Sequence, residues 1–470
     1  MRIRFSNKIY IHEYTAEQLR WCENNLIIPN PEWENAERMG LWSAHTLPHT
    51  LSLYERQGNC LVLPFGLMRE VIGWVKGKER AEGNPERIPF ETYFTLCQPL
   101  GMKEKDGGIK LYPYQEQAVE AMKKATFGIL KAPCGSGKTQ MALALIEKLG
   151  LKALWLTHTH KLLEQSKERA ERYFTGDFGT ITDGKVNIGK DITFATIQTM
   201  SKLDPSIYSD KFNVIVVDEC HRAVGTPTKA MMFYRVLSNC RARFKFGVSA
   251  TIDENNPMTN TMMAILGKVA YEVPPSAVGE KIIKADLIFV ENETQYSILS
   301  YSKGDGEMDY NKLVNTLCED SERTESILQY VLDIIPTGRQ QLILTHRVRH
   351  AKEMYEDLKA KGVDASLMIG NVSEKKRNDK ASVIVATYAL AKEGLDIPNL
   401  SVLHLATPQQ QKSCTIQSVG RIERNVDGKP KPIVYDYVDV SIPYCLNSAT
   451  KRRRYLGKAK KEVRTFKLNP

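Results

Sequence analysis

The chain has 470 residues, 42% hydrophobic and 26% charged, which is a globular composition over a length that exceeds one ordinary domain. Its net charge is +10. It holds no apolar run long enough to span a membrane, no signal-peptide core and no Cys-x-x-Cys pair among its nine cysteines. We therefore expect a cytoplasmic protein of two or three domains with no disulfide framework and no zinc ribbon.

Residues 1–100 contain short apolar segments broken by Pro, Gly and Asn, a pattern that predicts a small α+β module. This segment holds four of the five tryptophans, which are Trp21, Trp33, Trp42 and Trp74, interleaved with arginines. Two interpretations stay open. Tryptophans are more often core residues, but with arginines they also form nucleic-acid surfaces through stacking and phosphate contact.

Two series of apolar, branched runs alternate with helix-forming stretches in the rest of the chain. The first comprises 127–131, 153–157, 192–196 and 214–218, and the second comprises 341–345, 382–387, 401–405 and 432–436. Buried parallel strands give this pattern. We therefore predict an α/β fold in which the amino-terminal module is followed along the chain by two tandem parallel-sheet domains, at 101–275 and 276–450.

The last twenty residues, 451–470, form a basic segment with nine Lys or Arg and one acid, a net charge of +8. Such a segment attracts a polyanion, and the release of counterions from phosphates makes that attraction salt-sensitive. The alternative is a solvated face of a last helix.

A glycine-rich segment lies between the strand predicted at 127–131 and the helix predicted after it. Its residues are Ala132, Pro133, Cys134, Gly135, Ser136, Gly137, Lys138 and Thr139. The context and spacing predict a phosphate-binding loop whose backbone N–H groups turn toward a polyphosphate. Lys138 would offer its charge to the β and γ oxygens, and Thr139 its hydroxyl to Mg²⁺.

Two further clusters complete the predicted chemistry. Asp218 and Glu219 end a buried strand, where Asp218 would hold Mg²⁺ and Glu219 would orient and deprotonate a water. Near the end of the chain, Arg421 and Arg424 are three residues apart and would share a face if their segment is helical. Such arginines can neutralise charge that develops on a γ-phosphate.

Read in order, these segments resemble the motifs of superfamily 2 helicases. The eight matches are Tyr112 to Gln115 (Q motif), Ala132 to Thr139 (I), Thr157 to His160 (Ia), Asp218 to His221 (II), Ser249 to Thr251 (III), Gln341 to His350 (IV), Ala386 and Thr387 with Glu393 to Asp396 (V), and Gln417 to Arg424 (VI). The resemblance implies two RecA-like domains, catalytic roles for Lys138, Asp218, Glu219, Gln417, Arg421 and Arg424, and an adenine contact for Gln115. It also implies that Thr196, Arg347 and Thr387 lie near a nucleic-acid backbone.

Motif VI begins with Gln417 and not with the His usual in DEAD-box RNA helicases, which favours a DNA enzyme. The segment Asn30 to Trp42 and the region around Asp320 to Arg323 resemble phage recombination helicases of the UvsW type and their XPB-like relatives. We therefore expect an ATP- and Mg²⁺-dependent translocase acting on branched or forked DNA in a bacterial or phage-infected cytoplasm, beside replication or recombination proteins. An RNA helicase of the same fold and the motor subunit of a restriction complex are the alternatives.

Overall fold

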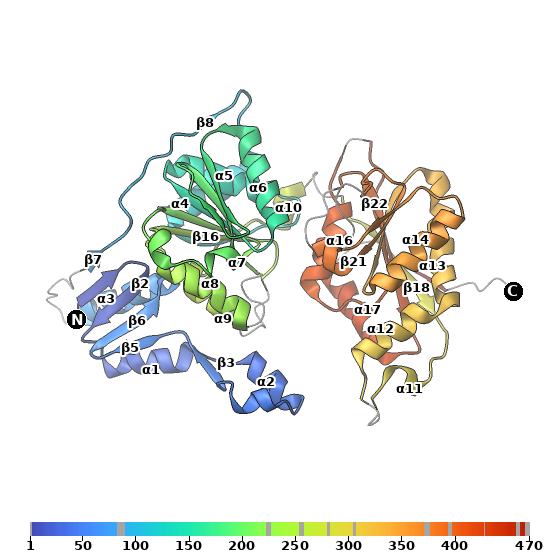
Figure 1. The fold of residues 1–470 in the computed structure, drawn as a ribbon, viewed down its shortest axis with the longest axis horizontal. Helices are drawn as coiled ribbons and strands as arrows, with labels where there is room; N and C mark the ends of the chain where they lie inside the picture. The colour runs from blue at the N-terminus through green and yellow to red at the C-terminus, as the bar shows by residue number, and fades with distance from the viewer. Residues whose placement is uncertain are drawn as a thin grey trace. The chain divides into compact units, whose positions relative to one another are not determined.

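The chain divides into two compact units, Met1–Val278 and Gly279–Pro470. The computed structural model describes residues 2–81, 90–221, 227–252, 258–279, 283–303, 307–370, 377–392, 397–426, 428–456 and 461–465. Each unit contains a large, mostly parallel sheet with helices packed around it, and the first unit carries a smaller sheet at its amino-terminal end (Figure 1). The predicted α/β fold is confirmed.

The small amino-terminal sheet has five strands in the order β5-β6-β2-β1-β7, in which only the β1–β7 pair is parallel. Its strands are β1 (Arg2–Phe5), β2 (Lys8–His12), β5 (Glu55–Gln57), β6 (Cys60–Pro64) and β7 (Phe90–Thr92). The helices beside it are α1 (Ala16–Asn25), capped by Thr15, and α3 (Met68–Ala81). A side arm consists of the pair β3 (Ile27–Pro29) and β4 (Thr50–Ser52), with α2 (Pro31–Arg38) and the 3-10 turn Trp42–His45 between them.

The amino-terminal module packs on the α/β part of the same unit through the turn Phe65–Leu67, which contacts α9 (Thr259–Leu266), and one hydrophobic core runs through both. A Cβ at Gly66 would lie 2.4 Å from the backbone nitrogen of Gly267, so only glycine permits this approach. The Phe65 ring meets the Phe127 ring edge-on at 5.4 Å. Lys245 is fully buried, 4.4 Å from the Phe65 centroid, and burial lowers its pKa to about 8. The predicted α+β module is therefore joined to the α/β part by shared packing.

Some tryptophans of this module are placed as core residues and one is placed as a surface residue. Trp21 and Trp74 pack edge-on at 5.0 Å against the core, and Trp33 stacks on His49 at 4.1 Å. Trp42, on the side arm, is 77% exposed. Only Trp42 is therefore placed as a surface ligand-binding tryptophan would be.

The large sheet of the first unit has the order β13-β12-β14-β10-β15-β16-β9-β17. Its strands are β9 (Phe127–Lys131), β10 (Ala153–Thr157), β12 (Phe178–Thr182), β13 (Lys185–Asn187), β14 (Ile192–Thr196), β15 (Val214–Asp218), β16 (Phe244–Ser249) and β17 (Val269–Glu272). Its helices are α4 (Pro113–Ala125), α5 (Lys138–Leu149), α6 (His160–Tyr173), α7 (Ile197–Met200), α8 (Pro227–Asn239), α9 (Thr259–Leu266) and α10 (Pro275–Val278). A two-stranded sheet pairs β8 (Lys103–Glu104) with β11 (Phe174–Thr175). All four predicted strands of this domain are present with the expected bounds.

The second unit has a seven-stranded sheet in the order β20-β21-β19-β22-β23-β18-β24, and every described pair in it is parallel. Its strands are β18 (Asp286–Asn292), β19 (Gln340–Thr345), β20 (Ala365–Met368), β21 (Val383–Thr387), β22 (Leu400–Leu405), β23 (Ile433–Asp439) and β24 (Lys461–Thr465). Its helices are α11 (Ile298–Tyr301), α12 (Tyr310–Glu319), α13 (Ser321–Ile334), α14 (Val348–Ala360), α15 (Tyr388–Lys392), α16 (Lys412–Ile422) and α17 (Pro443–Tyr455). Among the helices described in the two units, none is long and apolar enough to cross a membrane.

The basic carboxyl-terminal segment differs from both sequence interpretations at Arg452. This residue of α17 is 1% exposed and forms two hydrogen bonds to the carboxylate of Asp436, at 2.7 and 2.8 Å. Arg453 lies with its guanidinium carbon 4.0 Å from the Phe289 ring centroid. Arg452 therefore contacts neither solvent nor a polyanion, because its charge is used inside the unit. Lys458, Lys460 and Lys467 lie outside the described residues.

Candidate functional site in the first unit

The glycine-rich loop turns from the end of β9 into α5, as its sequence predicts. Gly135 and Gly137 have φ angles of 78° and 83°, a backbone conformation that residues with a Cβ atom rarely adopt. Ala132 is fully buried, and its N–H donates to the carbonyl of Ser249 at 2.9 Å. α5 begins at Lys138, so the positive end of the helix faces the space that the loop encloses.

Helix α4 holds this loop through Gln115 and Tyr114. The Gln115 carboxamide is 1% exposed; its nitrogen donates to the Ser136 carbonyl at 2.8 Å and its oxygen accepts from the Tyr112 N–H at 2.9 Å. The Tyr114 hydroxyl donates to the same Ser136 carbonyl at 3.0 Å. Gln115 therefore supports the phosphate loop in this structure, and its contact with adenine stays a prediction.

Three parallel strands bring the predicted motifs I, II and III to one edge of the sheet. In the order β15-β16-β9, Asp218 ends β15, Ser249 ends β16 and the glycine-rich loop follows β9. Because the carboxyl ends of parallel strands share an edge, Ala132 and Ser249, which are 117 residues apart in sequence, become neighbours.

The acidic pair lies at this edge in an environment that favours a cation. Asp218 is 7% exposed; burial and the charge of Glu219 raise the pKa of its carboxyl group, and Lys138 and Arg169 oppose that shift. Glu219 has a left-handed φ of 47°, and its N–H donates to Asp218 at 2.9 Å. A buried carboxylate whose charge is incompletely compensated, beside a hydroxyl such as that of Thr139, suits a hard cation with oxygen ligands. The residues present therefore fit Mg²⁺.

A chain of polar contacts connects Glu219 with the segment Ser249 to Thr251. The His221 Nδ1 atom lies 3.2 Å from the Glu219 carboxylate and 2.9 Å from the Ser249 hydroxyl. The Ser249 hydroxyl in turn donates to the Thr251 carbonyl at 2.7 Å. A displacement of the Glu219 side chain would therefore shift the residues at the end of β16.

Two residues of this site were missed by sequence reasoning, and both come from α6. The Ser166 hydroxyl lies 3.5 Å from an Asp218 carboxylate oxygen, and the Arg169 guanidinium donates to the Thr139 hydroxyl at 3.1 Å. The only signal in the sequence is their spacing of three residues on a helix that follows motif Ia. Thr196, predicted near nucleic acid, ends β14 at the same sheet edge, and its hydroxyl donates to that of Thr199 at 3.0 Å.

Candidate functional site in the second unit

The predicted nucleic-acid residues of the second unit lie at the carboxyl edge of its sheet. Arg347 follows β19 and caps α14, and its guanidinium donates to Asn315 at 2.7 Å and to Asn311 at 3.0 Å. Thr387 ends the neighbouring strand β21 and is 6% exposed. Glu393 to Asp396, the second half of the motif V match, lies outside the described residues.

Gln417 and Arg421 lie on α16 four residues apart, and so on one face of the helix. Arg421 and Arg424 were expected to share a face only if their segment is helical, and this condition is not met at Arg424, because α16 ends at Ile422. Arg424 follows Glu423, whose buried carboxylate accepts from the Ala285 N–H and from Lys284, both at 3.1 Å. The position of Arg424 is therefore set by the backbone that follows α16, which the contacts of Glu423 hold in place.

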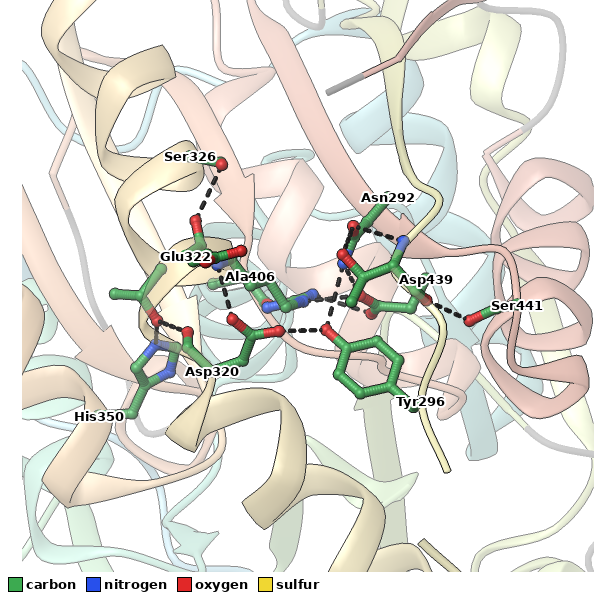
Figure 2. A network of polar contacts seen from close by, with 12 residues as sticks. Asn292, Tyr296, Asp320, Glu322, Ser326, His350, Ala406, Asp439 and Ser441 are labelled. Carbon is green, nitrogen blue, oxygen red and sulfur yellow. Dashed lines mark hydrogen bonds and ion pairs between the residues drawn. The ribbon is translucent and has the colours of Figure 1, made fainter. Parts of the chain in front are cut away.

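A buried network of hydrogen bonds and an ion pair stabilises the carboxyl edge of the sheet in the second unit. The Arg323 guanidinium is paired with Asp439 at 2.7 and 3.0 Å and also donates to the Ala406 carbonyl at 2.8 Å. Figure 2 shows Asp439, Asn292, Tyr296 and Asp320 joined by a continuous run of polar contacts. The sequence region 320–323 thus anchors α13 to β23 and to the end of β22, next to motif IV.

The features of the two units together identify a class of enzyme. A glycine-rich phosphate loop next to an acidic strand end, and a second parallel-sheet unit carrying arginines, are the components of a P-loop nucleoside triphosphatase with two RecA-like units.

Comparison with known proteins agrees with this class. The family model of the type III restriction enzyme res subunit matches residues 108–254. The putative ATP-dependent RNA helicase L396 of Acanthamoeba polyphaga mimivirus is 26% identical over 374 residues, which cover 76% of this chain and 70% of that protein. The ATP-dependent DNA helicase uvsW of Enterobacteria phage T4 is 22% identical over 428 residues, which cover 84% of this chain and 82% of that protein.

Among solved structures, the fragment of a putative HsdR subunit of a type I restriction enzyme from Vibrio vulnificus YJ016 is similar in fold. It has a TM-score of 0.54 at 18% identity, over 75% of this chain and 68% of that one. The chain is similar to superfamily 2 helicases and is an ATP-dependent helicase or translocase, an enzyme that hydrolyses ATP. The resemblance to helicases that the ordered motifs predict is confirmed.

Proposed function

We propose that this chain is an ATP-driven DNA translocase that remodels branched or forked DNA in recombination, repair or replication. The observation that carries the proposal is the convergence of motifs I, II and III at one edge of the first sheet, where the charge of Lys138 acts on Asp218. The choice of DNA is supported by the similarity to the phage T4 DNA helicase over most of both chains and by Gln417 at the start of motif VI.

The residues of the first unit have distinct roles in this proposal. Lys138 binds the β and γ oxygens of ATP, and Thr139 and Asp218 hold Mg²⁺, which when bound neutralises phosphate charge. Glu219 accepts a proton from the attacking water and keeps it oriented. His221 and Ser249 connect Glu219 with β16, so the state of the phosphates reaches the segment Ser249 to Thr251.

The second unit supplies the remaining charge. Arg421 and Arg424 would neutralise charge that develops on the γ-phosphate, and arginines in this role accelerate phosphoryl transfer by about 10³ to 10⁵. Thr196, Arg347 and Thr387 would contact the nucleic-acid backbone. Such contacts read phosphate and shape and give little base preference.

The side arm of the amino-terminal module supports the branched-DNA part of the proposal. It exposes Trp42, and beside it Met39 and Leu41 are 61% and 46% exposed. Glu34 and Glu37 are exposed on α2, so the arm repels phosphates. We therefore assign Trp42 to stacking on bases, which are accessible at a branch point, and not to the duplex backbone. A second tethered contact of this kind raises the avidity for a junction over that for a linear duplex.

A single substitution tests this role better than removal of the module, because the core of the module continues into the first unit. Trp42→Ala should slow ATP-dependent branch migration of a four-way junction at least fivefold, since stacking is worth about 1–3 kcal/mol per base. ATPase activity stimulated by linear DNA should stay parental. Val186→Ala, at a position 42% exposed on the edge strand β13, is the matched control. Equal loss on linear and branched DNA, measured at one salt concentration, would reject the branch-specific role.

Two alternatives have specific support. The similarity to the mimivirus RNA helicase favours an RNA substrate, and the match to the type III restriction enzyme res subunit favours a motor that drives a partner without separating strands. Stronger stimulation of ATP hydrolysis by RNA than by DNA would establish the first. Failure of the purified chain to separate or migrate strands, despite DNA-stimulated ATPase activity, would establish the second.

A further inference from the structure

Helix α6 presents one stripe of side chains to the phosphate loop. Ser166, Arg169 and Tyr173 follow one another at intervals of three and four residues, which places them on one face of the helix. Each contacts the neighbourhood of the proposed metal site: Ser166 reaches Asp218, Arg169 reaches Thr139, and the Tyr173 hydroxyl accepts from Gln140 at 2.6 Å. The two residues proposed to hold Mg²⁺ are therefore both contacted from the same helix.

The contact between Arg169 and Thr139 conflicts with metal binding at the same oxygen. A hydroxyl bound to Mg²⁺ lies about 2.0–2.1 Å from the ion, in a nearly fixed octahedral arrangement. A guanidinium that donates to that hydroxyl uses a lone pair of its oxygen and brings a like charge toward the ion. Arg169 and Mg²⁺ therefore compete for Thr139.

The far end of α6 lies at a different motif. The helix begins at His160, directly after the segment Thr157 to His160 that matches motif Ia, and the Thr157 hydroxyl donates to the Thr159 carbonyl at 3.1 Å. A 14-residue helix transmits a displacement at one end to the other, because its backbone hydrogen bonds make it nearly rigid. A change at Arg169 is thus connected to motif Ia, where the His158 carbonyl accepts from the Gln198 side chain at 2.8 Å, two residues after Thr196.

We propose that Arg169 is a positioning residue that takes the place of Mg²⁺ on the Thr139 hydroxyl in the nucleotide-free enzyme, and that its release on metal-nucleotide binding shifts α6 and so links magnesium occupancy to motif Ia. The inference rests on the proposed function, because it takes Thr139 and Asp218 as the metal-holding pair. By reciprocity, nucleic acid that draws α6 away from the loop lowers the Mg²⁺ concentration needed for nucleotide binding.

The test measures binding of a fluorescent ADP analogue to the full-length chain as Mg²⁺ is titrated, with and without forked DNA. In Arg169→Met the half-saturating Mg²⁺ concentration should fall about three- to tenfold, the effect of removing a partly exposed charged hydrogen bond. The factor by which DNA lowers that concentration should move toward one. Arg172→Met, an exposed position on the same helix, is the matched control and should behave as the parent.

Arg169→Lys keeps the charge but loses the planar fork, so an intermediate Mg²⁺ requirement is expected. It also serves if Arg169→Met does not fold. A half-saturating Mg²⁺ concentration that is unchanged or raised in both variants would overturn the inference, and a parental DNA effect would overturn the link to motif Ia. If binding to the parent did not depend on Mg²⁺ at all, the proposed metal site itself would fail, so the two failures are distinguishable.

Discussion

Arg452 offers a sharp test of the structure, because three basic residues in a row, Arg452, Arg453 and Arg454, have different environments. Its guanidinium is buried, pairs in bidentate fashion with Asp436, and also donates to the Gln409 carbonyl at 2.8 Å and the Ser448 hydroxyl at 2.6 Å. Burial acts against the charged form, but the Asp436 carboxylate more than offsets this and raises the pKa of Arg452. Arg452 thus keeps its charge over the whole practical pH range.

Arg452→Ala would leave the Asp436 carboxylate buried without its partner. Removing one member of a buried ion pair costs about 3–5 kcal/mol of unfolding free energy. With a urea dependence of roughly 2 kcal/mol per molar, the unfolding midpoint of the second unit should fall by about 2 M. Arg454→Ala, at an exposed position two residues on, should change it by less than about 0.5 kcal/mol.

The positions of the tryptophans allow the two units to be followed separately. All five lie at or before residue 155, in the first unit, so tryptophan fluorescence reports on that unit alone. Circular dichroism reports on both. Arg452→Ala should therefore move a dichroism transition and leave the fluorescence transition in place. The double variant Arg452→Met with Asp436→Leu should recover much of the loss, since it leaves no buried charge unpaired. A dichroism midpoint within about 0.5 M urea of the parent in Arg452→Ala would refute the buried pair.

Three other outcomes are expected. Glu219→Gln should bind ATP with near-parental affinity but turn over at least a hundredfold more slowly in a steady-state ATPase assay, because an amide cannot accept the water's proton; parental turnover would remove Glu219 as the base. Arg421→Ala should lower kcat far more than it changes nucleotide binding, as a group acting on the transition state does; a pure loss of binding would contradict this role. Lys245 has its pKa lowered by burial to about 8 from 10.5, so the folded state binds fewer protons than the unfolded state between those values and stability rises with pH there. The unfolding free energy followed by tryptophan fluorescence should accordingly rise by about 2 kcal/mol from pH 7.5 to 10 relative to Lys245→Met, and parallel pH profiles would show that the lysine is not buried.

Much of the fold was predictable because fully buried parallel strands leave continuous apolar runs in the sequence. The segments 127–131 and 214–218 were found with their exact bounds for this reason. The phosphate loop and the acidic pair were predictable because their chemistry restricts residue types at fixed spacing. That these two motifs lie at the same edge of the sheet could also be predicted, because the carboxyl ends of parallel strands share an edge.

The remaining features depend on packing that local sequence does not encode. Arg452 cannot be told from Arg453 and Arg454 by composition, and its partner Asp436 is recognisable only as a carboxylate inside a buried strand. The position of Arg424 beyond α16 could not be predicted, because a helix end shifts easily by one or two residues, and α16 ends at Ile422. Arg169 meets Thr139 only because α6 packs on α5, a tertiary contact between residues 30 positions apart.

The central claim, an ATP-driven motor for branched DNA, is tested most directly by the rate of ATP hydrolysis of the full-length chain on matched nucleic acids. Single-stranded, duplex, forked and four-way DNA and an RNA of the same sequence are compared at one salt concentration, with Lys138→Ala as the catalytic control. The account predicts the highest turnover on forked and four-way DNA, the lowest on RNA, and none above background on any of them for Lys138→Ala. Turnover that is independent of nucleic acid, or highest on RNA, would contradict it.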